Sequence, residues 1–251
     1  MSAITPIDQS ELEFDHGSFD SATFAREALS GWQALSAVTD AARLGPDVTR
    51  NQIEQLCTEA ARYRFASALV QPVWVSTAVG MLAGTGIPVG VVLGFPFGAS
   101  LTSTLRQEAA ALIRLGAREL DMVIPIGQLK SGNHQAVQHT IHAVANVAHH
   151  RGAILKVILE TSLLTVQEKL RVAEIAIQAG ADFIKTSTGF GTAGATVADV
   201  ALMRGVVGGR CGVCGSGSVR TLAEVKDLLE AGANRICSSA PVPILRELGA
   251  E

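Results

Sequence analysis

The stretch ILKVILETSLLTVQEKLRVAEIAIQAGADFIKTST (154–188) holds two short apolar runs on either side of an amphipathic segment. The runs ILKVILE (154–160) and FIKTST (183–188) have the length of buried strands. Between them, TVQEKLRVAEIAIQAG (165–180) repeats apolar residues at spacings of three and four, as a helix does. A strand, a helix and a second strand in this order predict a βαβ unit with parallel strands.

The same alternation extends over most of the chain. Six further apolar runs have the length of strands: ALSAV (34–38), FASALV (65–70), PVGVVLG (88–94), ELDMVI (119–124), GRCGVCG (209–215) and NRICSS (234–239). Other amphipathic segments lie at 49–63, 102–116, 134–150 and 220–232. Eight strand–helix units in 251 residues favour a single (β/α)8 TIM barrel over a doubly wound sheet, which usually has fewer strands and a glycine-rich dinucleotide turn. We expect residues 34–251 to form the barrel and residues 1–33 to form a short helical and polar N-terminal extension packed on it.

Composition narrows the classes of function. With 20 basic and 23 acidic residues the net charge is -3, and no segment forms a basic nucleic-acid patch. No apolar run approaches the roughly 20 residues that a membrane helix requires, and the polar start lacks the features of a signal peptide. We therefore expect a cytoplasmic protein with a small-molecule partner, no nucleic acid and no membrane. Four cysteines in such a compartment should stay reduced.

Three ionisable residues interrupt strands that are otherwise apolar: Asp121, Lys156 and Lys185. Burial of a charged side chain is unfavourable unless it is paired or has a function, and barrel enzymes carry their catalytic groups at the ends of strands. One interpretation is a satisfied ion-pair network in the core. The other is catalysis, because a carboxylate between two amines can keep one lysine cationic while the other is neutral and nucleophilic. Three such residues in successive strands favour Schiff-base chemistry with Lys185 as the nucleophile.

Five longer motifs stand out along the chain: PDVTRNQIEQLC (46–57), GFPFGA (94–99), ELDMVIPIGQLKSG (119–132), LKVILETSLLT (155–165) and AGADFIKTSTGFGTAGATVADVALMR (179–204). They resemble motifs of the deoxyribose-phosphate aldolases, a family of class I aldolases, and the resemblance covers about residues 36–240. The last block is the longest and most specific of the five.

The resemblance implies an α/β barrel and a lyase reaction of carbohydrate metabolism. It makes Lys185 the Schiff-base lysine, Asp121 an acid/base group that works through water, and Lys156 an additional cation. The implied reaction is the reversible cleavage of 2-deoxy-D-ribose 5-phosphate to acetaldehyde and glyceraldehyde 3-phosphate. It implies no metal and no cofactor, because the iminium ion polarises the substrate as a Lewis acid would. An aldehyde or sugar phosphate is the expected partner, and a homodimer is the candidate assembly.

The chain departs from the family pattern at the position of a second essential lysine. The family motif has the form VGVKASGGIR, whereas this chain reads CGVCGSGSVR (211–220), with Cys214 in the place of the lysine. The missing cation would lower the pKa of the nucleophile, so its loss could cost one or two pKa units, about 1.4 kcal/mol each. Cys214 should face the barrel interior, as a small apolar filler or a thiol. Since Cys211 should face the opposite side, we expect no metal at this CxxC pair.

The expected substrate-binding residues lie in strand ends and loops: Asp40, Thr186, Thr188, Gly189, Gly217, Ser218 and Ser239. The strand-one motif DHTLLKP reads DAARLGP (40–46), which keeps Asp40 but loses the histidine, the threonine and the lysine. Backbone amides at the start of the helix near Arg220 could hold a phosphate group.

Three functions remain open at this point. The first is the deoxyribose-phosphate aldolase reaction. The second is Schiff-base formation or cleavage of a C–C bond in a different carbonyl compound, including an unphosphorylated one, in specialised metabolism. The third is a non-catalytic barrel that binds a sugar phosphate or a protein partner.

Overall fold

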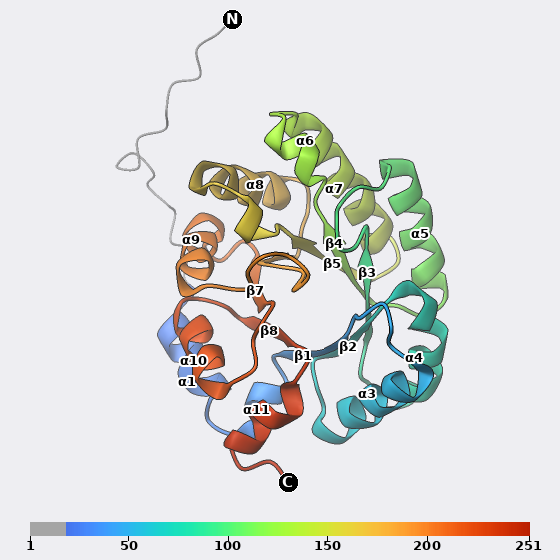
Figure 1. The fold of residues 1–251 in the computed structure, drawn as a ribbon, viewed down its shortest axis with the longest axis vertical. Helices are drawn as coiled ribbons and strands as arrows, with labels where there is room; N and C mark the ends of the chain where they lie inside the picture. Colours follow the sequence, from blue (N-terminus) through green and yellow to red (C-terminus); the bar gives the residue numbers. More distant parts are fainter. Residues whose placement is uncertain (1–18) are drawn as a thin grey trace, which may run out of the picture.

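A computed structural model describes residues 19–251, which form a closed barrel of parallel strands in the order β1 to β8 (Figure 1). The strands are β1 (Thr39–Arg43), β2 (Ser67–Val70), β3 (Val89–Leu93), β4 (Glu119–Val123), β5 (Ile154–Ile158), β6 (Phe183–Lys185), β7 (Gly212–Ser216) and β8 (Arg235–Ser238). Each strand pairs in parallel with the next, and β8 closes the barrel on β1. The predicted TIM barrel is confirmed.

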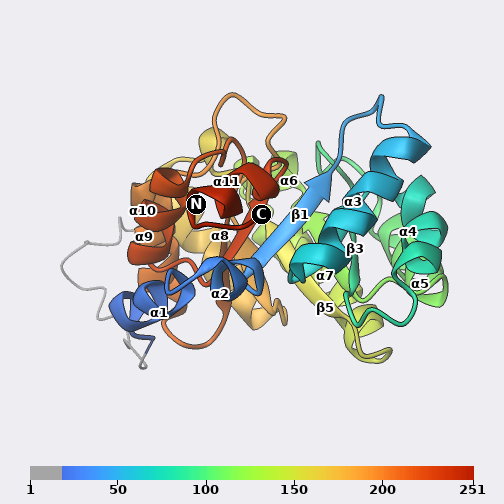
Figure 2. The same cartoon turned by 90° about the horizontal axis from the view of Figure 1, so that it is seen from below.

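The helices form a ring around the strands (Figures 1 and 2). They are α1 (Ser21–Ala28), α2 (Trp32–Ser36), α3 (Arg50–Tyr63), α4 (Val75–Leu82), α5 (Thr102–Arg114), α6 (Ile126–Lys130), α7 (His134–His149), α8 (Val166–Gln178), α9 (Val197–Val207), α10 (Leu222–Glu230) and α11 (Pro241–Glu247), with short 3-10 turns η2 (Pro72–Trp74) and η3 (Thr161–Leu163). Helix α8 begins at a capping box, in which the Thr165 side chain accepts a hydrogen bond from the N–H of Glu168. The expected ends also hold, because Gly116 and Gly180 follow α5 and α8 with positive φ of 111° and 94°.

The first strand lies later in the chain than its apolar pattern predicts. Residues 34–38 form most of α2 and a turn, with Leu35 buried, and β1 is the following segment TDAAR. This strand has the small side chains of Ala41 and Ala42 beside the charged Asp40, so it lacks the bulky apolar residues by which the other strands are recognised. The prediction of a strand at 34–38 was therefore wrong.

The N-terminal helices pack at the end of the barrel where the strands begin. Helix α1 contacts α10, and α2 contacts α11 and β1. Figure 2 shows both helices near the start of β1 and away from its C-terminal end. The part of the expected extension that falls in residues 1–18 lies outside the described residues.

Two apolar clusters make up the core. The larger one fills the space between strands and helices, and the smaller one, the inner cluster, consists of Ala42, Leu69, Val92, Cys214 and Cys237. None of these five side chains is more than 6% exposed. The inner cluster comes from β1, β2, β3, β7 and β8, so one side of the barrel interior is apolar.

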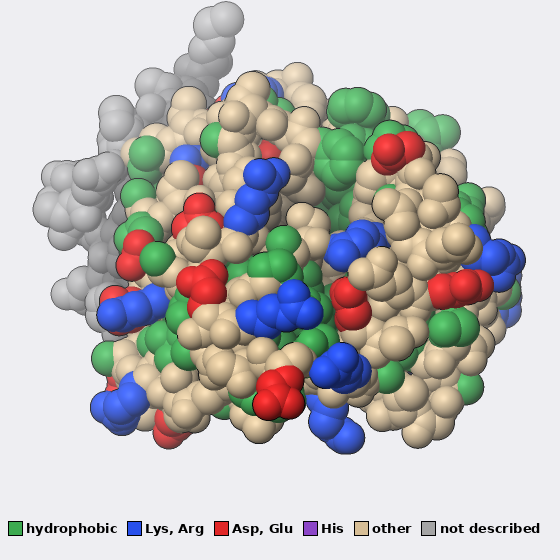
Figure 3. Space-filling view, turned by 60° about the horizontal axis from the view of Figure 1, so that its bottom comes forward, with side chains coloured by type: hydrophobic (Ala, Val, Ile, Leu, Met, Phe, Trp, Pro, Cys, Tyr) green, Lys and Arg blue, Asp and Glu red, His purple; other side chains and the backbone are tan. Residues whose placement is uncertain are grey.

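The surface has a mixed charge. On the face shown in Figure 3, basic and acidic side chains are interspersed, as the small net charge predicts. Across residues 19–251 the structure has no helix that combines the length and the apolar character needed to cross a membrane.

Candidate active site

The register of three neighbouring strands brings Asp121, Lys156 and Lys185 together. Asp121 lies opposite Lys156 across β4 and β5, and Lys185 ends β6. The Nζ atom of Lys185 donates a hydrogen bond of 2.6 Å to Oδ2 of Asp121, and Nζ of Lys156 lies 3.6 Å from Oδ1 of Asp121. All three side chains are at most 2% exposed. The three residues that interrupt the apolar strands thus form one buried group.

Lys156 has closer partners than Asp121. Its Nζ atom donates to Oδ2 of Asp40 at 2.7 Å and to Oε2 of Glu119 at 2.5 Å. Both carboxylates are also held by Arg235, whose Nε donates to Asp40 at 2.8 Å and whose Nη2 donates to Glu119 at 2.9 Å. Three acidic and three basic side chains therefore form a charge-balanced network, which we call the six-charge network: Asp40, Glu119, Asp121, Lys156, Lys185 and Arg235.

Glu119 and Arg235 were missed in the sequence because they open their strands and do not interrupt them. A signal was nevertheless present. Glu119 is two residues before Asp121, so their side chains lie on the same side of β4. Two carboxylates on the inner side of β4 predict two partners for a buried cation on the neighbouring strand, which is Lys156.

The network keeps both lysines protonated. Burial disfavours the charge of Lys185, but its acidic surroundings, chiefly the adjacent Asp121 carboxylate, together outweigh burial, and the pKa of Lys185 lies above its ordinary value. Burial likewise opposes the charge of Lys156, and the carboxylates of Asp121, Asp40 and Glu119 together raise its pKa well above the usual range. The structure departs from the expectation that one of the two amines is neutral at rest.

Cys214 lies beside the candidate nucleophile. It is the register partner of Lys185 across β6 and β7 and is fully buried in the inner cluster. Burial raises the pKa of its thiol, so a neutral group stands where the family motif has a cation. Cys211 belongs to the larger core, its Sγ contacts the carbonyl oxygen of Ala181, and burial raises its pKa to about 12. The two cysteines thus face opposite sides of β7, as strand alternation predicts.

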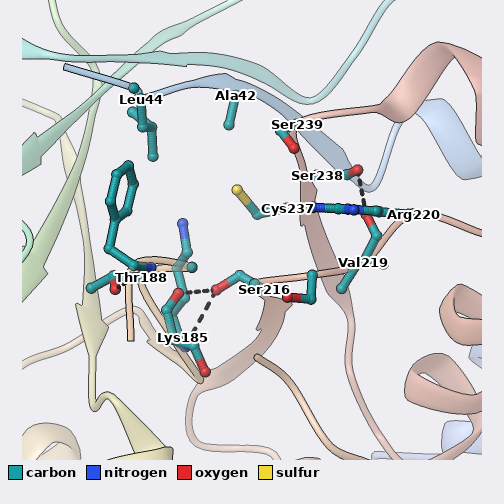
Figure 4. Close-up of a pocket in the computed structure, with 16 residues that line it drawn as sticks. Ala42, Leu44, Lys185, Thr188, Ser216, Val219, Arg220, Cys237, Ser238 and Ser239 are labelled. Carbon is teal, nitrogen blue, oxygen red and sulfur yellow. Dashed lines mark hydrogen bonds between the residues drawn. The ribbon is translucent and has the colours of Figure 1, made fainter. Parts of the chain in front are cut away.

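A cavity of about 280 Å³ opens above Lys185 at the C-terminal ends of the strands (Figure 4). Of the predicted substrate-binding residues, Thr188, Gly189, Gly217, Ser218 and Ser239 line it. Asp40 does not line it and belongs to the six-charge network, and Thr186 turns its hydroxyl to the carbonyl oxygen of Ser216 at 2.9 Å. The cavity also has lining residues that the sequence did not single out: Ala42, Leu44, Ser187, Phe190, Ser216, Val219, Arg220, Cys237 and Ser238.

The loop between β6 and α9 covers the cavity. In Figure 1 this loop, drawn in orange, lies over the centre of the barrel. Glu160, at the end of β5, accepts hydrogen bonds from the backbone N–H of Thr188 at 3.1 Å and from the Thr188 hydroxyl. Glu160 is 2% exposed, and its backbone has a φ of 55°. The carboxylate of Glu160 therefore ties the covering loop to β5.

The helix near Arg220 is capped by acidic side chains. The carboxylate of Glu224 accepts hydrogen bonds from the backbone N–H of Arg220 at 2.8 Å and of Thr221 at 3.0 Å. The carboxylate of Glu247 accepts one from Leu222 at 3.2 Å. Three amides at this helix start are thus occupied, which differs from the expectation that they are free to hold a phosphate group.

Comparison with known proteins agrees with this geometry. The model of the DeoC/LacD family of aldolases matches residues 3–236. A deoxyribose-phosphate aldolase of Geobacillus sp. (strain WCH70) is 47% identical over 211 residues, which cover 84% of this chain and 94% of the relative.

Two solved structures are similar over nearly their whole length. A putative deoxyribose-phosphate aldolase from Coccidioides immitis is 35% identical with a TM-score of 0.83, and the match covers 92% of this chain and 98% of that one. A deoxyribose phosphate aldolase from Aeropyrum pernix, described as a unique tetramer, is 29% identical with a TM-score of 0.84, covering 91% and 96%. The match of the family model and the extent of these similarities confirm the resemblance, and the chain belongs to the DeoC/LacD family of aldolases.

Proposed function

We propose that this chain is a class I aldolase that reversibly cleaves 2-deoxy-D-ribose 5-phosphate to acetaldehyde and glyceraldehyde 3-phosphate through a Schiff base on Lys185. The observation that carries the proposal is the Lys185 amine, which lines the cavity and contacts a carboxylate that can take its proton. The names of the relatives support the choice of substrate.

The first step needs a neutral amine. Lys185 is protonated at rest, so it first transfers a proton to Asp121 along their 2.6 Å hydrogen bond. The amine then attacks the C1 aldehyde of the open-chain sugar phosphate. Asp121 returns its proton to the oxygen of the carbinolamine, which leaves as water, and the protonated Schiff base remains. Lys156, held by three carboxylates, stays cationic throughout and keeps Asp121 in place.

The second step breaks the C2–C3 bond. The C3 hydroxyl loses its proton to Asp121, directly or through water, and the electron pair of the bond moves into the iminium group to form an enamine. Glyceraldehyde 3-phosphate leaves with C3 as its aldehyde carbon. Protonation of the enamine at C2 and hydrolysis then release acetaldehyde and restore the amine. The six-charge network is suited to this cycle because one proton moves within a fixed, balanced set of charges.

The phosphate group would lie at the other end of the cavity. Gly217 and Ser218 turn the chain there with φ of 85° and 59°, and Ser218, Ser239 and Arg220 are exposed. Since Glu224 occupies the amides at the start of α10, the Arg220 guanidinium and the two hydroxyls are the groups that would bind the anion.

Borohydride trapping tests the proposed function. We expect reduction in the presence of 2-deoxyribose 5-phosphate to leave a two-carbon adduct on Lys185, detected by mass spectrometry of the digested protein. The Lys185→Met variant should give no adduct and no turnover, while Lys169, a lysine of α8, should remain unmodified in both proteins. An unmodified Lys185 together with full turnover would contradict the proposal.

The proposal extends to assembly and location. We propose that the chain forms a homodimer in the cytoplasm. The tetrameric description of the Aeropyrum pernix relative supports self-association, and four cysteines that are all free thiols support a reducing compartment. Light scattering should give about twice the chain mass of 26.1 kDa. A monomer at micromolar concentration would contradict the assembly without affecting the proposed reaction.

A further inference from the structure

Cys237 borders the same cavity as the candidate nucleophile. It lies on β8, one residue before the end of that strand, and both Cys237 and Lys185 line the cavity of about 280 Å³. In Figure 4 the sulfur atom of Cys237 and the amine of Lys185 point into the same space, one from β8 and the other from β6. Carbon atoms attached to the amine would therefore lie next to the sulfur atom.

The charges of the two groups influence each other. Burial lowers the pKa of Lys185, and among the anionic groups that raise it Cys237 ranks second, after Asp121. Burial raises the pKa of the Cys237 thiol, and the Lys185 cation opposes this more than any other charge does. Because burial prevails, the thiol holds its proton at neutral pH. A positive charge on the Lys185 nitrogen nevertheless favours the thiolate.

The hydroxyl groups around these two side chains already donate their protons within the protein. Each gives its only proton to a carbonyl oxygen or a carboxylate, and the residues that carry them are at most 8% exposed. They are Thr186, Thr188, Ser216 and Ser238. The Ser187 Oγ atom has no hydrogen-bond partner among the described residues, but that atom is buried and closed off from the cavity. None of these hydroxyls is placed to protonate a bound ligand.

Two other acidic groups beside Lys185 lie outside the cavity. Asp121 is fully buried and contacts the amine, but it is not one of the lining residues. Cys214 is fully buried as well, does not line the cavity, and has its Sγ atom 4.0 Å from the carbonyl oxygen of Gly215. Within residues 19–251, Cys237 is therefore the acidic side chain next to Lys185 that borders the space for a ligand.

The last step of the proposed reaction needs a proton at a carbon atom. Cleavage of the C2–C3 bond leaves an enamine on Lys185, and its C2 atom must gain a proton before acetaldehyde can leave. Asp121 contacts the nitrogen of this group from the buried side, whereas C2 would lie on the cavity side. We therefore expect the proton donor for C2 on the cavity wall.

We propose that the Cys237 thiol protonates C2 of the enamine on Lys185, and that its thiolate removes a proton from the same carbon when the reaction runs towards synthesis. This inference rests on the proposed function and assigns a catalytic residue to its last step. The proton transfer turns a neutral enamine and a neutral thiol into an iminium cation and a thiolate. Each new charge thus forms next to its opposite, which favours both.

The protons of this step balance within the cavity. The S–H bond of Cys237 breaks, the electron pair of the C1–C2 double bond forms the new C–H bond, and the nitrogen lone pair forms the C=N bond of the iminium ion. Water then attacks C1 and gives a proton to the thiolate, which restores the thiol. The carbinolamine releases acetaldehyde, and the amine recovers its proton from Asp121. No group is oxidised or reduced.

Deuterium in the trapped adduct tests the inference. The protein is mixed with acetaldehyde in D₂O, borohydride is added after increasing times, and the mass of the ethyl group on Lys185 is measured after digestion. Each removal of a C2 proton, followed by its return from a deuterated thiol, adds deuterium until the methyl group is fully labelled. The amount of adduct reports imine formation, and its deuterium content reports proton transfer at C2.

Two variants remove the thiol. We expect Cys237→Ala and Cys237→Ser to form the adduct as the parent protein does and to label it about 100-fold more slowly, since a positioned acid or base contributes at least that much. Labelling that slows less than tenfold in both variants would overturn the inference. The serine side chain has nearly the size of the cysteine side chain, so this variant carries the test if the alanine variant does not fold.

Further comparisons identify the cause of each failure. Cys211→Ala, which removes a thiol from the opposite side of β7, is the control and should label the adduct at the parent rate. Slower labelling in Cys214→Ala, with an unchanged rate in Cys237→Ala, would overturn the assignment to Cys237. The absence of an adduct on Lys185 in the parent protein would refute the proposed function itself. An adduct that the parent and both Cys237 variants label equally fast would refute only this inference, with water as the proton donor.

Discussion

Cys214 determines how strongly Lys185 holds its proton. On the β7 side the amine faces a neutral thiol, and on the β4 side it contacts the Asp121 carboxylate at 2.6 Å. Burial and the Lys156 cation oppose the charge of Lys185, but the Asp121 carboxylate attracts it and β7 adds no positive charge, so the pKa of Lys185 is raised. A raised pKa means that the neutral amine is scarce at pH 7. Imine formation should therefore accelerate as the pH rises.

Replacing Cys214 with lysine should restore the opposing charge. In the Cys214→Lys variant, we expect 2-deoxyribose 5-phosphate turnover at pH 7.5 to increase at least tenfold, because a second cation lowers the pKa of Lys185 and one unit corresponds to about 1.4 kcal/mol. The pH profile of borohydride trapping should move to lower pH. Cys214→Met, which has a long but uncharged side chain, should show neither change. A Cys214→Lys protein that folds but shows no gain in turnover would contradict this account of Cys214.

Glu119 should influence the same amine without touching it. Its carboxylate draws Lys156 away from Asp121, since Lys156 lies 2.5 Å from Glu119 and 3.6 Å from Asp121. In Glu119→Gln, we expect Lys156 to turn towards Asp121 and the network to gain one net positive charge. Both effects lower the pKa of Lys185. Trapping at pH 7.5 should become at least threefold faster, about half a pKa unit.

The charge-preserving variant Glu119→Asp is the control for that experiment. Its trapping rate at pH 7.5 should stay near that of the parent protein, and both variants should unfold cooperatively so that a loss of structure is recognised. Slower trapping in the glutamine variant than in the aspartate variant would show that Glu119 acts through packing and not through its charge.

At the scale of elements, the barrel places Lys185 at the last residue of a very short strand. Strand β6 ends at Lys185, and the covering loop begins at once. The position of this loop therefore depends on the hydrogen bonds of Glu160 to Thr188, which tie it to β5. Buried bonds to a charged acceptor contribute about 1.5–3 kcal/mol each.

Removal of the Glu160 carboxylate should loosen the loop. In Glu160→Ala, we expect faster hydrogen exchange in residues 188–195 and a KM for 2-deoxyribose 5-phosphate raised about tenfold, because the loop lines the cavity through Thr188 and Phe190. Glu160→Gln keeps one oxygen acceptor and should lose less than half of that effect. Exchange that stays slow in the alanine variant would contradict the role of Glu160 as a tether.

The sequence predicted the barrel well because bulky apolar strands alternate with amphipathic helices, and it predicted the central group because Asp121, Lys156 and Lys185 interrupt such strands. The prediction failed where a strand lacks bulky apolar residues or where a charged residue does not interrupt an apolar run. Strand β1 is built around Ala41 and Ala42, and its position was misplaced by about five residues. The partners of Lys156, Glu119 and Arg235, stand at strand starts, and only the closure of the barrel brings β8 against β1 and next to β4 residues.

At the scale of the whole molecule, buried ionisable groups link stability to pH in both directions. Burial opposes the charge of Asp40, but Lys156 and Arg235 hold its pKa well below the usual range, so its contribution is lost as the pH falls below about 4. At alkaline pH, the buried thiols are the groups that make stability depend on pH. All four cysteines are buried with raised pKa values, led by burial in each case.

The thiols should make the alkaline limb of the stability curve steep. An unfolded thiol ionises near pH 8.5, whereas burial raises the pKa of Cys211 to about 12 in the folded protein. Above pH 8.5 the unfolded chain therefore releases a proton that the folded chain keeps, which favours unfolding by up to about 1.4 kcal/mol per pH unit for each such group.

Urea unfolding at pH 7.5, 8.5, 9.5 and 10 measures this slope of stability against pH. Cys211→Ala should be less stable at pH 7.5, since it leaves a small cavity, yet its free energy of unfolding should fall less steeply above pH 8.5. Parallel curves for the two proteins would mean that the Cys211 thiol does not titrate with unfolding. The lysines of the six-charge network cannot cause a loss in this range, because their raised pKa values keep their stabilising charge up to about pH 10.4.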